Sequence, residues 1–169
     1  MTATPRTLLI TGAYGTGKTT LAAEIVEPLA DHQGPCAAVD LDWLGWFWLP
    51  EKREHTVNDI VVANLRSIAQ TYEAAGVTHL LLAGTIRTTG ELDQLTAVVP
   101  RPLRVLQLTV PLAQISRRLA GDALSSRAED LEMSATEPNA GAEIADLTLA
   151  NEGDIDDLAR RVADLLGWL

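Results

Sequence analysis

The sequence is poor in several residue types, and each shortage excludes a class of protein. Its one cysteine, Cys36, cannot form a disulfide within the chain, and no thiol or histidine cluster has the spacing of a zinc site. With 13 Lys and Arg against 23 Asp and Glu, the net charge is -10, whereas nucleic acids and anionic membranes attract basic proteins. No apolar run approaches the roughly 20 residues of a membrane-spanning helix. We therefore expect a cytoplasmic protein with no nucleic-acid or membrane partner.

The acidic surplus is confined to the C-terminal part of the chain. Residues 1–120 hold 11 acids and 10 bases, whereas residues 121–169 hold 12 acids and 3 bases. Part of this surplus, Asp154, Asp156 and Asp157, opens a predicted helix, where the helix dipole favours negative charge. The surplus therefore does not describe the charge of the first 120 residues.

Short apolar runs alternate with segments of helical periodicity, which is typical of a parallel sheet covered on both faces. We expect one α/β domain over residues 1–169, as a monomer or a homodimer. The five predicted strands are Thr7–Thr11, Cys36–Leu41, Thr78–Ala83, Arg104–Val110 and Ala145–Ala150.

Helices are predicted in four of the intervening segments. They are Gly17–Ala30, with its last turn frayed or kinked at Pro28; Thr56–Ala75, opened by the capping pattern of Thr56 and Asp59; Pro111–Leu119; and Asp154–Leu166. Residues 43–54 and 121–141 receive no assignment. In a compact domain, segments of that length usually form lids or binding elements.

A glycine-rich loop, Gly12-Ala13-Tyr14-Gly15-Thr16-Gly17-Lys18-Thr19, lies between the first predicted strand and a helix that continues with Thr20. It fits the phosphate-binding pattern G-x-x-x-x-G-K-[ST]. The glycines allow backbone N–H groups to turn toward an anion, and the helix start adds its dipole. We expect Lys18 to reach the β and γ phosphates of ATP and Thr19 to ligate Mg²⁺.

On this loop the sequence resembles the P-loop NTPases, and among them the small kinases related to adenylate, shikimate and gluconate kinases and to chloramphenicol phosphotransferase. The resemblance covers essentially the whole chain. It implies a three-layer sandwich whose five parallel strands lie in the order 2-3-1-4-5. It further implies an acceptor-binding segment at about residues 43–56 and a lid at about residues 120–141, where the two unassigned segments fall.

Two carboxylates, Asp40 and Asp42, end the second predicted strand and point to the same side. Ligands of open α/β sheets bind at this edge, so either carboxylate could accept the proton of an attacking hydroxyl. Alternatively, the pair caps the following turn or holds Mg²⁺ through water. The run Asp42-Trp43-Leu44 resembles gluconate kinases, which implies that Asp42 is the base and Asp40 its companion at the acceptor.

Three arginines are candidates for contacts with phosphate or acceptor. The run Gly84 to Arg87 is similar to the Gly-x-x-Arg of adenylate kinases, which implies that Arg87 binds an acceptor anion; a solvated loop arginine is the alternative. Arg118 matches the first lid arginine of the family. The second lid arginine is replaced by Asp122, so the catalytic role needs Arg127 to substitute, and a solvated helix face is the alternative.

Four of the seven aromatic residues, Trp43, Trp46, Phe47 and Trp48, lie within six positions. They could pack against the sheet, wall an acceptor pocket suited to a planar or apolar alcohol, or form a patch for a protein partner. The leading hypothesis is an ATP- and Mg²⁺-dependent kinase of a small hydroxyl or phosphate acceptor. The alternative is a nucleotide-binding switch or accessory ATPase that acts through a protein partner.

Overall fold

The structure is a computed structural model that describes residues 6–46, 54–119, 132, 135–136 and 139–168. Its strands are β1 (Thr7–Thr11), β2 (Cys36–Asp40), β3 (His79–Ala83), β4 (Leu103–Thr109) and β5 (Leu147–Ala150). Its helices are α1 (Lys18–Gln33), α2 (Leu41–Leu44), α3 (Glu54–Ala74), α4 (Thr89–Thr96), α5 (Leu112–Leu119) and α7 (Ile155–Leu166). Across the described residues, none of the helices is both long and apolar enough to cross a bilayer.

The five strands form one sheet in the order β2-β3-β1-β4-β5. Every neighbouring pair is parallel. The number of strands and their order are therefore confirmed. Because all strands run the same way, their carboxyl ends share one edge, and the connections that follow β1, β2 and β3 emerge there side by side.

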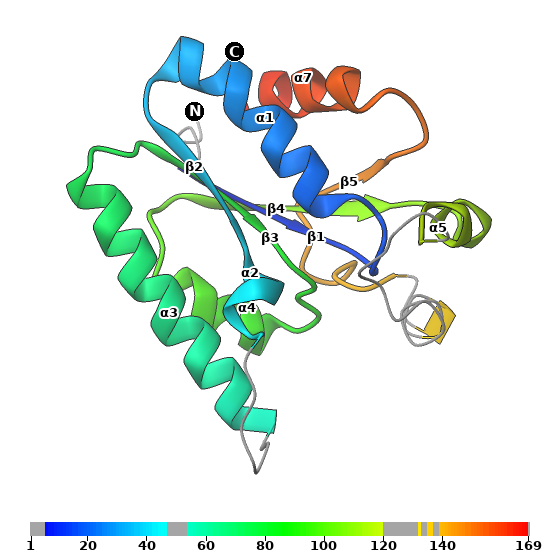
Figure 1. Cartoon of the computed structure of the whole chain (residues 1–169), viewed down its shortest axis with the longest axis horizontal. Helices are drawn as coiled ribbons and strands as arrows, with labels where there is room; N and C mark the ends of the chain where they lie inside the picture. The colour runs from blue at the N-terminus through cyan, green and yellow to red at the C-terminus, as the bar shows by residue number, and fades with distance from the viewer. Residues whose placement is uncertain (1–5, 47–53, 120–131, 133–134, 137–138, 169) are drawn as a thin grey trace.

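Helices cover both faces of the sheet, so the three-layer sandwich is also confirmed (Figure 1). Alternation along β1 decides which side chain meets which layer. Leu8 and Ile10 are fully buried in a cluster with apolar side chains of α1 and α7. Leu9 points to the other face and packs in a cluster with α3 and α4. The central strand is thus held on both sides.

Two helix boundaries differ from those predicted. Helix α1 continues through Pro28 to Gln33 and ends at Gly34, whose φ is 88°, so the predicted fraying is wrong. Helix α3 begins at Glu54, so Thr56 lies inside it and is not its cap. Residues 54 and 55 include no glycine or proline that would stop the helix from starting earlier.

Two short helices, α2 and α4, were not predicted. Each begins at a side-chain cap. The Thr88 hydroxyl accepts a hydrogen bond from the Glu91 N–H, and the Glu91 carboxylate accepts one from the Thr88 N–H. This capping box is a sequence signal that could have revealed α4. Helix α2 has only four residues, too few to show a helical period.

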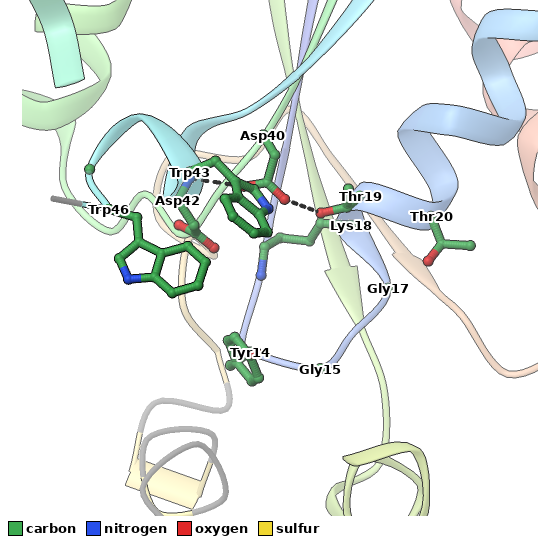
Figure 2. Close-up of a pocket in the computed structure, with 11 residues that line it drawn as sticks. Tyr14, Gly15, Gly17, Lys18, Thr19, Thr20, Asp40, Asp42, Trp43 and Trp46 are labelled. Atoms are coloured by element: carbon green, nitrogen blue, oxygen red, sulfur yellow. Dashed lines mark hydrogen bonds between the residues drawn. The ribbon is translucent and has the colours of Figure 1, made fainter. Parts of the chain in front are cut away.

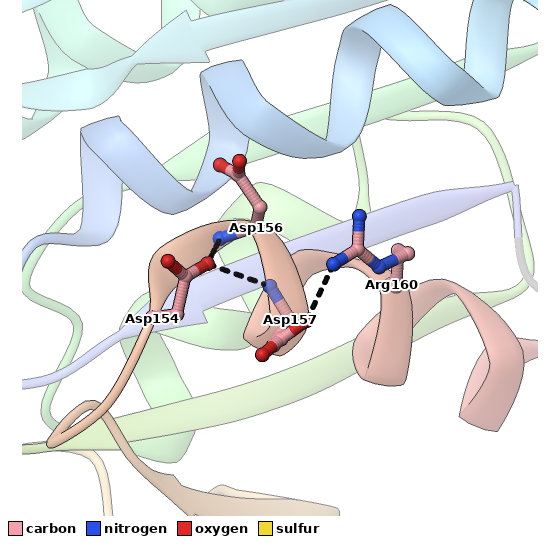
Figure 3. Close-up of polar contacts among 4 residues, drawn as sticks. All are labelled: Asp154, Asp156, Asp157 and Arg160. Carbon is pink, nitrogen blue, oxygen red and sulfur yellow. Dashed lines mark hydrogen bonds and ion pairs between the residues drawn. The ribbon is translucent and has the colours of Figure 1, made fainter.

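Helix α7 explains part of the acidic surplus. The Asp154 carboxylate caps its first turn and accepts hydrogen bonds from the N–H groups of Asp156, at 2.9 Å, and Asp157, at 3.2 Å (Figure 3). Asp157 also pairs with Arg160 on the same helix. The predicted helix-start role of these aspartates is therefore confirmed, and their negative charge stabilises α7.

Candidate active site

The glycine-rich loop connects β1 to α1, which confirms the predicted context of strand, loop and helix. Gly12, Gly15 and Gly17 all have positive φ, the region that favours glycine. At Gly12, an added Cβ would lie 2.3 Å from the Leu108 carbonyl oxygen on β4. The loop therefore leaves the sheet in close contact with β4, and any residue with a side chain would clash at position 12.

Threonine hydroxyls fix the loop from within and from the β3–α4 connection. The Thr16 hydroxyl donates to the Ala13 carbonyl at 2.9 Å, and the Thr85 hydroxyl donates to the Gly12 carbonyl at 3.1 Å. Thr11 donates to the Ile86 carbonyl and accepts from the Ile86 N–H, both at 3.0 Å. Because these bonds use up backbone carbonyls, the loop has a defined shape before any ligand binds.

The side chain of Lys18 turns back into the glycine-rich loop, toward Gly12 and Ala13. Its side chain is 6% exposed, and its ammonium group donates to the carbonyls of Gly12 at 3.2 Å and Ala13 at 3.1 Å. Burial lowers the pKa of Lys18, while the nearby carboxylates of Asp42 and Asp40 act in the opposite direction. The ammonium is thus held in a partly desolvated position, where an anion would stabilise its charge.

Asp40 uses both of its carboxylate oxygens within the protein (Figure 2). One oxygen accepts the Thr19 hydroxyl at 2.6 Å, and the other accepts the Asp42 N–H at 2.9 Å as the N-cap of α2. The alternative in which Asp40 caps the following turn is therefore what the structure shows. The same bond places Asp40 beside Thr19, the residue predicted to ligate Mg²⁺.

Asp42, the predicted base, faces the charged groups of the loop. Burial raises the pKa of its carboxyl, and Asp40 adds to that effect, whereas the positive charges of Lys18 and Arg87 oppose it. A carboxylate with a raised pKa binds a proton more readily, as a general base must. The catalytic role of Asp42 stays a prediction.

The loop and the predicted acceptor residues line one cleft of about 570 Å³. Figure 2 shows Lys18 and Asp42 together in it, with the two tryptophans beside Asp42. The lining residues are Tyr14, Gly15, Gly17, Lys18, Thr19, Thr20, Asp40, Asp42, Trp43, Gly45 and Trp46. Apart from the glycines and Tyr14, seven of the predicted site residues therefore meet here: Lys18, Thr19, Thr20, Asp40, Asp42, Trp43 and Trp46.

Arg118 lies behind the loop, outside the lining of this cleft. Its guanidinium donates to the Thr16 carbonyl at 3.2 Å and to the Asn151 carbonyl at 2.9 Å. In this conformation Arg118 joins α5 to the loop and to the end of β5. Its predicted action on the transferring phosphoryl stays a prediction, and the structure adds a positioning role.

Asn151 is the residue of this site that the sequence reasoning missed. Its side chain is 3% exposed and donates from Nδ2 to the Thr16 carbonyl at 2.9 Å. A trans peptide points its carbonyl and the next N–H in opposite directions, so holding the Thr16 oxygen turns the Gly17 N–H the other way, toward the inside of the loop. The available signal was an asparagine directly after a predicted strand, at the ligand-binding edge.

The hydrogen bond from Asn151 to the Thr16 carbonyl also requires a glycine at position 17. Its φ is 91°, and an added Cβ would lie 2.7 Å from Asn151 Nδ2. Any larger residue would therefore push the Asn151 amide off the Thr16 carbonyl. The loop and the end of β5 are fitted to each other at this point.

The remaining arginine candidates are not brought into the cleft. Arg87 is half-buried, its backbone N–H donates to the Glu91 carboxylate at 2.8 Å, and it lies outside the lining. Its charge still acts on the pKa of both Lys18 and Asp42. Arg127, Asp122, Phe47 and Trp48 lie outside the described residues, as do most of the predicted lid and the middle of the predicted acceptor segment. For Arg87, acceptor binding stays a prediction.

Thr19 and Asp40 form the one place in the described cleft suited to Mg²⁺. A hydroxyl and a carboxylate are hard oxygen donors, which Mg²⁺ prefers, and it usually takes few protein ligands and completes its shell with water and phosphate. No group of three or more His, Cys, Asp or Glu side chains that could hold a metal ion occurs in the described ranges. The donor set fits a metal that arrives with a nucleotide.

A parallel sheet of this order, with a phosphate-type loop between β1 and α1, defines the fold of the P-loop proteins. Among solved structures, the chain resembles an unliganded sugar kinase from Janibacter, with 19% identity, a TM-score of 0.70, and coverage of 96% of this chain and 94% of that one. It also resembles the shikimate kinase of Bacteroides thetaiotaomicron (16% identity, TM-score 0.66, 96% and 99% covered). The APS kinase of Mycobacterium tuberculosis, in complex with AMPPNP and APS, follows at 22% identity and a TM-score of 0.63, with 98% and 99% covered.

The chain therefore has the fold of the small P-loop kinases over nearly its whole length. No family model and no curated protein matches the sequence. At these identities the similarity shows the fold alone, and the chemistry open to this protein depends on the residues of its cleft.

Proposed function

We propose that this protein is an ATP- and Mg²⁺-dependent phosphotransferase that acts on the hydroxyl group of a small molecule. The observation that carries the proposal is the shared cleft, in which the loop lysine, Lys18, and the carboxylate of Asp42 are close enough to shift each other's pKa. A phosphate donor on the loop and a hydroxyl beside Asp42 would meet between these two groups.

The loop would bind the phosphates of ATP through its backbone N–H groups and the start of α1. Lys18, partly desolvated and turned into the loop, would exchange its contacts with the Gly12 and Ala13 carbonyls for phosphate oxygens. Those two carbonyls keep the Thr85 and Thr16 hydroxyls as donors. The exchange therefore leaves no backbone acceptor without a hydrogen bond.

Mg²⁺, when bound, supplies charge neutralisation at the phosphates. Thr19 and Asp40 are the residues that would hold it, directly or through water. Because Asp40 also caps α2, which carries Asp42 and Trp43, the metal side and the acceptor side of the cleft share one residue. Asp42 would orient the acceptor hydroxyl and receive its proton.

The experiment is ADP release from ATP with a panel of nucleosides, nucleoside monophosphates, sugar acids, sugars and aromatic alcohols. We expect at least one acceptor to raise the rate well above that of ATP alone, and Asp42→Asn to reduce the increase roughly 10²- to 10⁴-fold. The matched control is Asp164→Asn, an exposed carboxylate near the end of α7. It should leave the rate unchanged.

Stoichiometric ATP binding with slow turnover that no acceptor accelerates would contradict the proposal. That result would favour a nucleotide-dependent switch, in which the exposed tryptophans of α2 and its end contact a protein partner.

A further inference from the structure

The cleft contains two unusually exposed aromatic side chains. Trp43 is 59% exposed and Trp46 is 70% exposed, and their ring centroids are 4.6 Å apart with the planes at 56°. Of the described residues, the other large apolar side chains with comparable exposure are Leu112 and Leu165, both outside the cleft. Large aromatic faces left in water are unfavourable unless a ligand covers them.

The two rings are held by a short anchored turn. Asp40 caps the start of α2, and the Gly45 and Trp46 N–H groups donate to the Asp42 and Trp43 carbonyls, both at 3.2 Å. On its inner side, α2 is pressed onto the β3–α4 connection, because a Cβ on Gly84 would lie 2.8 Å from that of Leu41. The rings therefore belong to a formed wall of the cleft, next to Asp42 (Figure 2).

The charges of the described lining residues disfavour an anionic acceptor. The charged residues of the described lining are Lys18, Asp40 and Asp42. Lys18 is turned into the loop, where phosphate would take its charge, and the two carboxylates repel a second anion. Arg87 acts on this group from outside the lining. The wall opposite the loop thus offers aromatic faces and a carboxylate, with no cation of its own among the described residues.

We propose that the acceptor is an uncharged alcohol that carries an aromatic or heteroaromatic ring, with the ring packed on Trp43 and Trp46. Such a ring would cover the exposed indole faces, since flat π systems stack on tryptophan largely irrespective of their substituents. Its hydroxyl would then lie at Asp42. This inference rests on the proposed function and names the substrate class of the same site.

The reaction balances with ATP as the only co-reactant. The acceptor hydroxyl oxygen forms a bond to the γ-phosphorus, and the bond between that phosphorus and the β–γ bridging oxygen breaks. The hydroxyl proton passes to the Asp42 carboxylate and then to water. The products are ADP and the phosphate monoester of the ring-bearing alcohol.

The test compares acceptors and tryptophan variants in ADP release. Adenosine, uridine and 2-phenylethanol represent uncharged alcohols with an aromatic or heteroaromatic ring. Gluconate and shikimate represent acids, glucose represents an uncharged acceptor without an aromatic ring, and ethanolamine represents a cationic one. Trp43→Ala and Trp46→Ala remove each ring, Trp43→Phe and Trp46→Phe keep an aromatic face, and Trp43→Leu and Trp46→Leu keep only apolar bulk. Leu165→Ala, which trims an exposed apolar side chain on α7, is the control.

We expect an alcohol with an aromatic or heteroaromatic ring to have the highest kcat/KM, and each alanine variant to raise its KM roughly 5- to 150-fold with a smaller effect on kcat. The phenylalanine variants should recover most of the loss, whereas the leucine variants should not. If an alanine variant fails to fold, the phenylalanine and leucine pair decides by the same comparison. The inference is wrong if an acceptor without an aromatic ring or a charged acceptor is preferred, or if phenylalanine and leucine behave alike. If no acceptor accelerates ADP release, the proposed function itself fails.

Discussion

The two walls of the cleft are built in opposite ways. On the loop wall, Thr16 and Lys18 are almost fully buried, and their polar groups already have partners. On the facing wall, Trp43 and Trp46 are more than half exposed, and their rings contact each other. The first wall is complete without a ligand, and the second has apolar faces that remain in water.

The walls also differ in how far along the chain their contacts reach. The loop is tied to Ile86 and to Asn151, residues that lie 75 and 135 positions away from their partners. The facing wall is a turn of seven residues, 40–46, whose hydrogen bonds run within the turn and to Thr19 and Asn64, 21 and 20 positions away from their partners. A change at the exposed Trp43 or Trp46 should therefore alter specificity without disturbing the loop, whereas a change in the loop affects several elements at once.

The largest expected effect comes from removing the positive charge of the loop wall. Lys18→Met should lower kcat for phosphoryl transfer by roughly 10²- to 10³-fold, because the charge that meets the phosphates is lost. The folded protein should nevertheless become more stable at neutral pH, since burial lowers the pKa of Lys18 and the charged form is disfavoured in the folded state. The melting temperature and kcat should be measured on the same sample.

The stability gain of Lys18→Met has a defined pH dependence. It should be largest below the lowered pKa of Lys18 in the folded protein and fade as the pH rises from that pKa to the range where a lysine in water loses its proton. A melting temperature below that of the wild type at pH 7 would show that the hydrogen bonds to Gly12 and Ala13 outweigh the burial of the charge.

The second prediction tests whether tertiary contacts shape the loop. Asn151→Ala leaves the Thr16 carbonyl with Arg118 as its donor and should weaken the binding of an ATP analogue roughly 3- to 10-fold. Asn151→Asp places a carboxylate against that carbonyl and should weaken binding further, about 10- to 100-fold. Titration calorimetry measures both. Equal affinities for the wild type and Asn151→Asp would remove Asn151 from the site.

A third prediction separates stability from function at the same connection. Asp154→Ala removes the cap of α7, three residues beyond Asn151, and should lower the free energy of unfolding by about 1 kcal/mol. Affinity for the ATP analogue should not change, because Asp154 contacts only its own helix start. Denaturant unfolding supplies the first value and calorimetry the second. A loss of affinity here would mean that the effect of Asn151 variants reflects general destabilisation.

The smallest effect concerns the junction of the two walls. Burial raises the pKa of Asp42, so its ionised form destabilises the folded protein at neutral pH, and Asp42→Asn should raise the melting temperature there. The gain should disappear as the pH falls through the raised pKa toward the ordinary range of a carboxyl group. Melting curves from pH 4 to pH 8 check this. A gain that persists at the acidic end would have another cause than ionisation.

Local patterns were sufficient to predict most of the fold. Strand β1, the glycine-rich loop and the start of α1 follow from an apolar run, three glycines and a helical period that are adjacent in sequence. Helix α2 could not be predicted, because its four residues are too few to show a helical period. The sequence signal for α4 is its capping box, formed by Thr88 and Glu91. The start of α3 was placed two residues too late, since Thr56 resembles a cap but the helix begins before it.

The candidate site likewise has residues whose place could be predicted from local sequence and residues whose place could not. Lys18, Thr19 and Asp42 could be predicted because each lies at a fixed offset from a strand end. The position of Arg118 could not, because the sequence does not show whether a long flexible side chain turns toward the cleft or toward the Thr16 and Asn151 carbonyls. The same holds for Asp40, whose two oxygens are divided between Thr19 and the cap of α2.

The sequence by itself determined the parallel α/β sheet, the phosphate-type loop and, to within one residue, where each strand ends, because these depend on patterns among neighbouring residues. Only the tertiary structure decided that Asn151 holds the loop, that Asp40 is a cap, and that Trp43 and Trp46 stand exposed beside Asp42. The reason is physical: hydrogen bonds and burial between segments far apart in the chain depend on how the layers pack, and no local pattern records that packing.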